Sequence, residues 1–315
     1  MKSERTIQRG AVRTTPVGRA GGPGRILAGA VALLLSSAPF NNVAWAITGG
    51  EPDGTRHPNV GAIIACDPLY GIIPMGSGTL IHERVFLTAG HCVAPIENGE
   101  VTLLGVSFDE ELVAGDPVDP STWFDYEVVR EVCSYSHWQG ADPSRTDIGV
   151  LVLKDPVMNV SRATLPTAGL LDNLKKARQL KAGPRGTRFT VVGYGFGLAW
   201  PPPELIWPYE PVPVEYNGQR VLFWGGARNV AQTGYFGLNG GWLITLQNPA
   251  TGNGGTAMGD SGGPTFWINP TTGQEVLVSI TAWGDPNCVA MDFSYRIDTV
   301  ESLNFIQGVI DSLEE

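Results

Sequence analysis

Three short stretches of the sequence carry residues that could act together in catalysis: His91 in "LTAGHCV", Asp147 in "TDIGVLVL" and Ser261 in "GDSGGP". A serine hydroxyl is a weak nucleophile unless a neighbouring base removes its proton. Histidine can be that base near neutral pH, and a buried aspartate fixes the tautomer of the imidazole and stabilises its protonated form. Each residue alone is more often structural, but the three together predict covalent catalysis at Ser261.

The glycines around Ser261 predict a second part of the same site. Glycine tolerates backbone conformations that other residues avoid. The backbone N–H groups of Gly259 and Ser261 can therefore converge on a developing negative charge. An oxyanion hole of this kind stabilises the transition state by roughly 2.7–4 kcal/mol for each donor.

The order of the three residues narrows the class of enzyme. Subtilisin-like enzymes have the order Asp, His, Ser, and α/β-hydrolases have the order Ser, Asp, His. The order here is His, Asp, Ser, and "TAGHC", "DIGVLVL" and "GDSGGP" resemble the signatures of the trypsin/chymotrypsin-like secreted serine protease family. "VVGYG" (191–195) and "TAWG" (281–284) are similar to the segment that opens the family's second barrel and to its substrate-binding strand. The resemblance spans roughly residues 47–313.

This resemblance implies an all-β fold: two antiparallel six-stranded β-barrels with a C-terminal α-helix, the trypsin-like serine protease fold. His91 and Asp147 would come from the first barrel and Ser261 from the second. The implied activity is that of a serine endopeptidase, which cleaves peptide bonds through an acyl-enzyme intermediate. The implied partners are a polypeptide substrate and a protein inhibitor of proteases, and no cofactor is implied.

The elements that must position these residues are predicted to be mostly short strands. The chain contains 41 glycines and 24 prolines, and its β-branched runs are separated by Gly, Pro and Asp. We expect strands at 60–65, 78–82, 84–88, 101–106, 126–132, 148–153, 188–195, 220–225, 241–247, 264–268 and 275–283.

Three other segments differ from this strand pattern. Residues 172–186 favour a helix, and the apolar residues of 298–313 recur at helical spacing. The proline-rich stretch 200–215 predicts a stiff surface loop, because proline fits neither a central strand nor a helix. The predicted domains are a first β-barrel at 47–165, an inter-barrel linker at 166–187, and a second β-barrel plus C-terminal helix at 188–315.

Residues 1–46 have the features of a secretory signal peptide. A basic region is followed by the apolar run 26–35 and by the small-x-small pattern Ala44-Trp45-Ala46. We expect cleavage after Ala46 and a secreted protein, periplasmic or extracellular; an uncleaved membrane anchor is the alternative. Because the segment carries six basic residues and one acid, the formal net charge changes from −10 to −15 without it. Such an acidic surface argues against binding to nucleic acid, and against binding to anionic membranes after cleavage.

The sequence after Ala46 begins "ITGG", which resembles the "IVGG" start of the protease family. The resemblance implies that the ammonium group of a free Ile47 pairs with Asp260, the residue before the predicted nucleophile. A buried ion pair needs a free and charged amine. Signal cleavage would then create the active N-terminus directly. The alternative is that a few more residues remain and a second protease removes them.

Four cysteines in an exported chain predict two disulfides. The resemblance implies a disulfide between Cys66 and Cys92, which would fix the histidine loop. Cys133 and Cys288 could pair by elimination, but four cysteines allow three pairings.

The resemblance also places a substrate pocket. The residue six before the nucleophile selects Lys and Arg when it is aspartate, and here it is Gly255. Trp283 and Gly284 would form an open pocket mouth. We expect Asp292 to supply a negative charge from the opposite wall; the alternative is that the alignment slips and Asp292 faces solvent.

Two other functions and one ion site are alternatives to this prediction. A non-catalytic binding protein on the same fold is the first alternative function, and an esterase for small substrates is the second. The acidic stretch 108–112, with Asp116 and Asp119, could hold calcium, but it lacks the EF-hand pattern and is more typical of a solvated loop. His57, His82 and His137 do not have the spacing of a metal site, so no metal is predicted.

Overall fold

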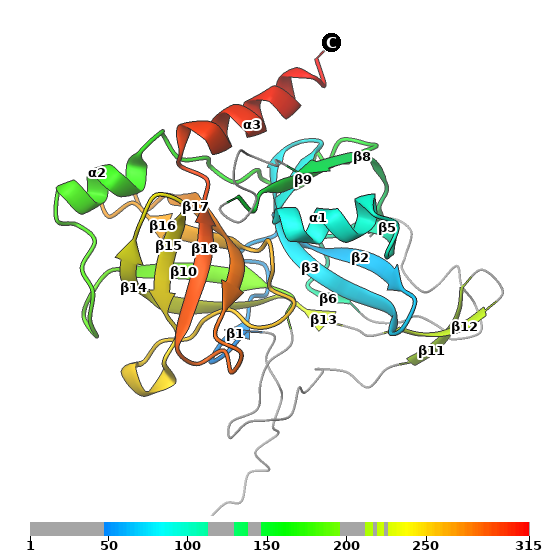
Figure 1. The fold of residues 1–315 in the computed structure, drawn as a ribbon, viewed down its shortest axis with the longest axis horizontal. Coiled ribbons are helices and arrows are strands. Elements are labelled where there is room, and N and C mark those ends of the chain that lie inside the picture. The colour runs from blue at the N-terminus through cyan, green and yellow to red at the C-terminus, as the bar shows by residue number, and fades with distance from the viewer. Residues whose placement is uncertain are drawn as a thin grey trace, which may run out of the picture. The chain divides into compact units, whose positions relative to one another are not determined.

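A computed structural model describes residues 47–112, 129–137, 146–195, 212–216, 219–223 and 226–314. The predicted signal peptide, Asp116 and Asp119 lie outside these residues, as does most of the proline-rich stretch. The described part is predominantly β (Figure 1). The all-β prediction is therefore confirmed.

Six strands form a closed antiparallel barrel. Their order is β14-β10-β16-β17-β18-β15, and β15 pairs with β14 to complete the ring. The strands are β10 (Arg188–Gly193), β14 (Asn229–Leu238), β15 (Trp242–Leu246), β16 (Pro264–Ile268), β17 (Glu275–Gly284) and β18 (Met291–Arg296). This barrel matches the one predicted for the C-terminal half of the chain.

The other main sheet is a half-barrel. Its order is β7-β5-β2-β3-β4-β9-β8. The strands are β2 (Val60–Asp67), β3 (Gly71–His82), β4 (Val85–Thr88), β5 (Thr102–Ser107), β7 (Val129–Arg130), β8 (Val132–His137) and β9 (Gly149–Leu153). A second closed six-stranded barrel was expected here. The described ladder ends instead at β7 and β8, which follow one another in the chain with Glu131 between them and are not paired with each other.

Shorter strands attach to these two sheets. β1 (Glu51–Pro52) pairs with β14, so the start of the described chain belongs to the closed barrel. β6 (Glu111–Leu112) pairs with β13 (Gly226–Ala227). β11 (Val212–Tyr216) and β12 (Gln219–Phe223) form a hairpin, and β12 touches β3. The end of the proline-rich stretch is thus an edge strand rather than a loop, a position in which proline is tolerated.

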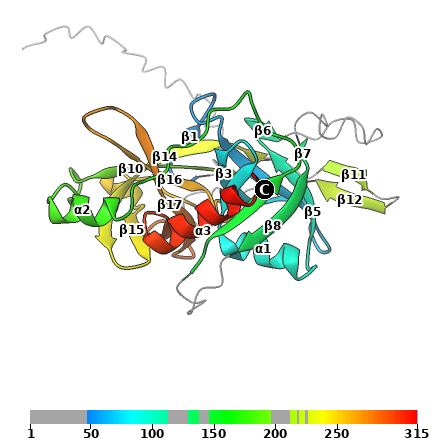
Figure 2. The same cartoon turned by 90° about the horizontal axis from the view of Figure 1, so that it is seen from above.

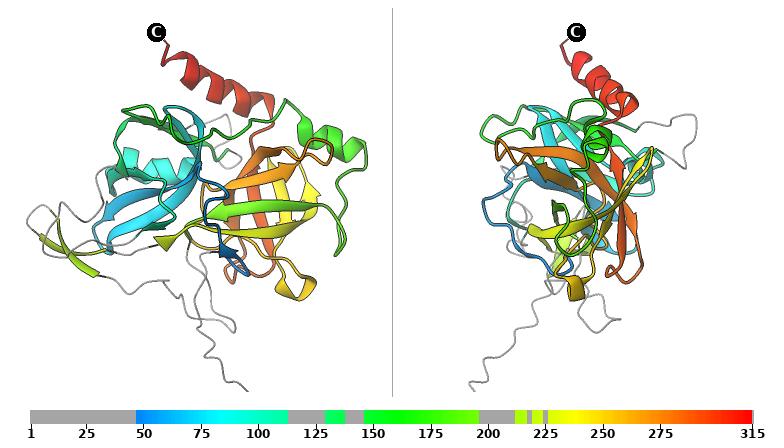
Figure 3. Two further views of the ribbon diagram at one scale, coloured as in Figure 1. Left: turned by 180° about the vertical axis from the view of Figure 1, so that it is seen from behind. Right: turned by 90° about the vertical axis from the view of Figure 1, so that its left-hand side faces the viewer.

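Three α-helices complete the described fold (Figures 2 and 3). α1 (Gly90–Glu97) follows β4, and α2 (Leu170–Lys176) is shorter than the helical stretch predicted at 172–186. α3 (Val300–Asp311) confirms the predicted C-terminal helix and buries Ile306 in the main core. That core contains Val60 and Ile148 from the half-barrel segments together with Phe266 and Leu277 from the closed barrel.

Candidate active site

The turn that carries Ser261 is hydrogen-bonded to β3 of the half-barrel. The Ser261 carbonyl oxygen accepts a hydrogen bond from the backbone N–H of Ser77 on β3, at 2.8 Å. The next residue, Gly262, has a φ of +80°, and a Cβ there would lie 2.0 Å from the Thr88 hydroxyl and 2.5 Å from the Ser77 carbonyl oxygen. Only glycine fits this approach. The "SGG" sequence therefore fixes the position of the serine between β3 and β16.

His91 lies in the first turn of α1 and contacts Asp147 just before β9. The His91 backbone N–H donates to Asp147 Oδ1 at 2.9 Å, and the ring Nδ1 lies 2.9 Å from Oδ2. A Cβ on Gly90 would lie only 3.2 Å from the Ile148 backbone nitrogen. Glycine therefore lets the start of α1 approach the strand that carries the carboxylate.

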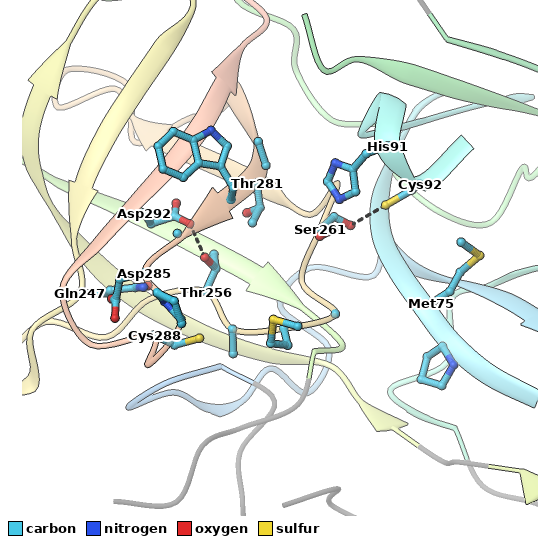
Figure 4. A pocket seen from close by; sticks show the side chains of 18 of the residues that line it. Met75, His91, Cys92, Gln247, Thr256, Ser261, Thr281, Asp285, Cys288 and Asp292 are labelled. Atoms are coloured by element: carbon cyan, nitrogen blue, oxygen red, sulfur yellow. Dashed lines mark hydrogen bonds between the residues drawn. The ribbon is translucent and has the colours of Figure 1, made fainter. Parts of the chain in front are cut away.

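The contact with Asp147 determines the tautomer of the histidine. An ionised carboxylate only accepts hydrogen bonds, so Nδ1 must be the donor. In the neutral ring Nε2 is then the free acceptor. His91 and Ser261 line the same pocket and lie close together in Figure 4. Among the described residues no hydrogen bond joins Nε2 to the Ser261 hydroxyl, and such catalytic contacts often tighten only when substrate is bound.

The surroundings of His91 favour its protonated form. Burial lowers the pKa of the imidazole, but the sulfur of Cys92 and the carboxylate of Asp147 outweigh this effect and raise the pKa. The carboxylate acts by stabilising the imidazolium. A stabilised imidazolium is what a general base must form when it takes a proton from serine.

The predicted oxyanion hole consists of the backbone amides of Gly259 and of Ser261 itself. In the part of the chain that the structure describes, neither the N–H of Gly259 nor that of Ser261 donates to another residue. The neighbouring amides of Asp260, Gly262 and Gly263 all have partners. Gly259 has a φ of +90°, a conformation that favours glycine. The predicted oxyanion hole therefore has unpaired donors at both positions.

The pocket beside Ser261 has a volume of about 750 Å³. His91, Cys92 and Ser261 lie on one side of it, and Gln247, Thr256 and Asp292 on the other (Figure 4).

The predicted pocket mouth lies on β17. Gly284 and Trp283 both line the pocket, and the Trp283 ring stacks on Phe293 with ring centroids 3.7 Å apart. Trp283 is 52% exposed, so it can cover a ligand that enters from solvent.

Asp292 is buried in the pocket wall and does not face solvent. It lies on β18 and is 1% exposed. Its Oδ1 accepts from the Thr256 hydroxyl at 2.5 Å, and its Oδ2 from the Ser294 hydroxyl at 2.9 Å. Burial raises the pKa of the carboxyl to about 6, although the two hydroxyl bonds lower it. Of the two alternatives for this residue, the structure has the one in which it lines the pocket.

Gly255 leaves room for a residue that sequence reasoning missed. A Cβ on Gly255 would lie 2.1 Å from Gln247 Oε1 and 2.2 Å from Gln247 Cβ. The glutamine side chain therefore occupies the space that a side chain at 255 would need. Gln247 follows β15, far from any catalytic motif, so only the pairing of the strands could reveal it.

Ile47 and Asp260 are both buried, but no ion pair joins them in the described structure. Ile47 is 0% exposed and packs with Val191 and Ala231. Asp260 is also 0% exposed and accepts from the backbone N–H groups of Gly195 and Ala257 at 2.8 and 2.7 Å. In the continuous chain the nitrogen of residue 47 is an amide and carries no charge. Burial raises the pKa of Asp260 to about 8, as expected for a carboxyl group without a cation.

The cysteine prediction is wrong in this structure. All four cysteines are free, so neither the Cys66–Cys92 disulfide nor a Cys133–Cys288 disulfide is present. Cys66 lies on β2 opposite Ile72, whereas the Cys92 thiol donates to the Ser261 carbonyl oxygen at 3.6 Å. The residue beside Cys92 Sγ is Gly76, which has no side chain to bridge.

Comparison with known protein families finds no family model that matches the chain. Within the described residues, no helix is both long enough and apolar enough to cross a membrane. The same residues contain no group of three His, Cys, Asp or Glu side chains that could hold a metal ion.

Proposed function

We propose that residues 47–315 form a secreted serine endopeptidase of the trypsin/chymotrypsin-like type, with His91, Asp147 and Ser261 as its triad. The observation that carries this proposal is the His91–Asp147 hydrogen bond at 2.9 Å, in a pocket that also contains Ser261 and two unpaired amides. The closed barrel and the half-barrel support the two-barrel fold that the resemblance implies. The signal-like segment 1–46 supports export.

The chemistry follows from the arrangement of these groups. Ser261 Oγ attacks the peptide carbonyl carbon while His91 Nε2 takes the hydroxyl proton. The negative charge that develops on the carbonyl oxygen is bound by the amides of Gly259 and Ser261. The intermediate collapses, His91 donates its proton to the leaving amine, and the acyl group stays on Ser261. A water molecule then attacks the acyl group with His91 again as base, which releases the acid and restores the serine.

Both alternative functions make different predictions. A binding protein on this fold would not need a partnered His91 beside unpaired amides, and it would not hydrolyse any ester or peptide. An esterase for small substrates would show a high ratio of ester to peptide kcat/KM and no gain from longer peptides. The 750 Å³ pocket supports an endopeptidase, because it can hold a large substrate side chain beside Ser261.

Substitution of the proposed nucleophile tests the function. The full chain is expressed for export, and the secreted protein is assayed on a peptide-library substrate mixture. Ser261→Ala should lower kcat by on the order of 10⁶-fold, because triad members act as a unit. Ser134→Ala, at an exposed position on β8, is the matched control and should keep wild-type activity. Wild-type activity in Ser261→Ala would rule out the triad.

A further inference from the structure

The pocket beside Ser261 is lined by buried side-chain oxygen atoms. Asp292, Gln247 and Thr281 all line this pocket and are 1%, 1% and 4% exposed. They come from β18, from the residue after β15 and from β17, which are neighbouring parts of the closed barrel. The arrangement is therefore held by the sheet and not by a loose loop (Figure 4).

Two of these oxygens lack a hydrogen-bond partner. Gln247 Oε1 and Thr281 Oγ1 are buried, and no described residue donates to either. Buried polar atoms in folded proteins nearly always have a partner, and an unpaired one is destabilising. Unpaired acceptors that line a pocket can accept hydrogen bonds from a ligand that enters it.

The third of these groups is the Asp292 carboxylate, and no cationic side chain among the described residues is paired with it. Asp292 accepts only from the neutral hydroxyls of Thr256 and Ser294, and a carboxylate has room for about four hydrogen bonds. None of the described lysine or arginine side chains lines the pocket. The pocket's second carboxylate, Asp285, already accepts from three backbone amides of its own loop. Asp292 is thus the carboxylate left for a positively charged group.

The position of Gln247 explains why the pocket carboxylate is that of Asp292 on β18 and not one at position 255. Any side chain at 255 would collide with Gln247, so residue 255 cannot supply a carboxylate in this fold. The same crowding holds Gln247 beside the pocket, where its amide oxygen can accept a second N–H.

We propose that Asp292, Gln247 and Thr281 form a recognition site for the side chain that precedes the cleaved bond, and that they select arginine over lysine and both over neutral residues. This inference rests on the proposed function. A guanidinium group presents five N–H donors in a planar fork, which suits one carboxylate with two further acceptors. An ammonium group offers three donors and satisfies the same set less completely. The exposed ring of Trp283 can cover the apolar stem of either side chain.

The test compares p-nitroanilide peptides that are identical except for a last residue of Arg, Lys, citrulline or Leu. Citrulline has nearly the shape of arginine but is neutral. The wild type should cleave the Arg peptide at least about 100-fold better in kcat/KM than the citrulline peptide, because citrulline leaves the buried carboxylate without a charged partner. It should cleave the Arg peptide about 3- to 10-fold better than the Lys peptide, because lysine offers fewer donors. Equal cleavage of the Arg and citrulline peptides, or a preference for Leu, would overturn the inference without any variant.

Three variants test the role of each residue. Asp292→Asn keeps the shape and removes the charge, so the ratio of kcat/KM for the Arg peptide to that for the Leu peptide should fall by about 100-fold. Gln247→Leu should lower the Arg value by about 10-fold, and Thr281→Val by less. Unchanged Arg cleavage in Asp292→Asn would contradict the assignment.

A binding measurement separates this inference from the proposed function. Benzamidine, a small amidinium compound, should bind the wild type and bind Asp292→Asn at least about 10-fold more weakly by calorimetry. If no peptide is cleaved but benzamidine binding depends on Asp292, the proposed function fails and the recognition site stands. If peptides are cleaved but benzamidine does not bind, the recognition site fails and the proposed function stands.

Discussion

At the scale of single residues, the proton on His91 controls the proposed reaction. The imidazole must be neutral to take a proton from Ser261. Burial lowers its pKa, but Cys92 and Asp147 together raise it by more. Activity should therefore be lost as the pH falls through a value above the ordinary 6.5 or so of histidine. Asp147→Asn should lower kcat by on the order of 10⁴-fold and move the remaining acid limb to lower pH. The measurement is kcat/KM from pH 5 to 10, and a wild-type acid limb at or below pH 6.5 would contradict the role of Asp147.

Gly262 gives a second prediction at this scale, because a side chain there has no room. Gly262→Ala places a methyl group 2.0 Å from the Thr88 hydroxyl in a positive-φ conformation, so both activity and stability should fall sharply. Gly273→Ala is the matched control, since it also has a positive φ but nothing within 4 Å of the added Cβ. The control should lose only about 1–2 kcal/mol of unfolding free energy and none of its activity. Equal effects in denaturant unfolding would show that space around Gly262 is not the constraint.

At the scale of elements, a cysteine substituted for Gly76 on β3 could form a disulfide with Cys92 on α1. The Cβ of a residue at 76 would lie 2.9 Å from Cys92 Sγ. Gly76→Cys should form a disulfide under oxidising conditions and raise the free energy of unfolding by about 3 kcal/mol, the value for a closed loop of about 15 residues. Gly76→Ala is the control and should be destabilised by contact with the sulfur. Thiol titration checks the bond: a count of five free thiols after oxidation would contradict the geometry.

Some strands and the three motif residues were predictable from the sequence, whereas contacts between distant segments were not. Strands such as 60–65, 148–153 and 264–268 were predictable because their β-branched runs are bounded by turn residues, and His91, Asp147 and Ser261 because short motifs mark them. The cysteine pairing was not predictable, since spacing along the chain does not tell which residue faces Cys92 across the fold. Gln247 was missed for the same reason. The spacing of Asp298 and Glu301 predicts an N-cap at Asp298. The structure has Thr299 as the cap of α3 instead, because Arg296 and the Leu171 N–H already bind the Asp298 carboxylate.

At the scale of the whole molecule, removal of residues 1–46 should increase the proposed peptidase activity. A free ammonium at Ile47 would pair with Asp260, whose pKa is raised to about 8 by burial in the continuous chain. Protein that begins at Ile47 should be active, and one extra residue before it should lower kcat/KM by on the order of 100-fold, since breaking a buried pair costs about 3–5 kcal/mol.

The same pair predicts a limit at high pH. An ammonium group paired with Asp260 would lose its proton at high pH, and the contribution of the pair would be lost with it. Activity should therefore decline at alkaline pH in the protein that begins at Ile47. N-terminal sequencing of the exported protein should give Ile-Thr-Gly-Gly. Full activity with an extended N-terminus would rule out the ion pair.

The central claim is that Ser261 is an activated nucleophile, and one labelling measurement tests it most directly. The exported protein is treated with a fluorophosphonate, digested and mapped by mass spectrometry. We expect a single adduct on Ser261 and strongly reduced labelling in His91→Ala, because the histidine must remove the serine proton. An unlabelled Ser261 in folded protein that begins at Ile47, or labelling that does not depend on His91, would contradict the claim.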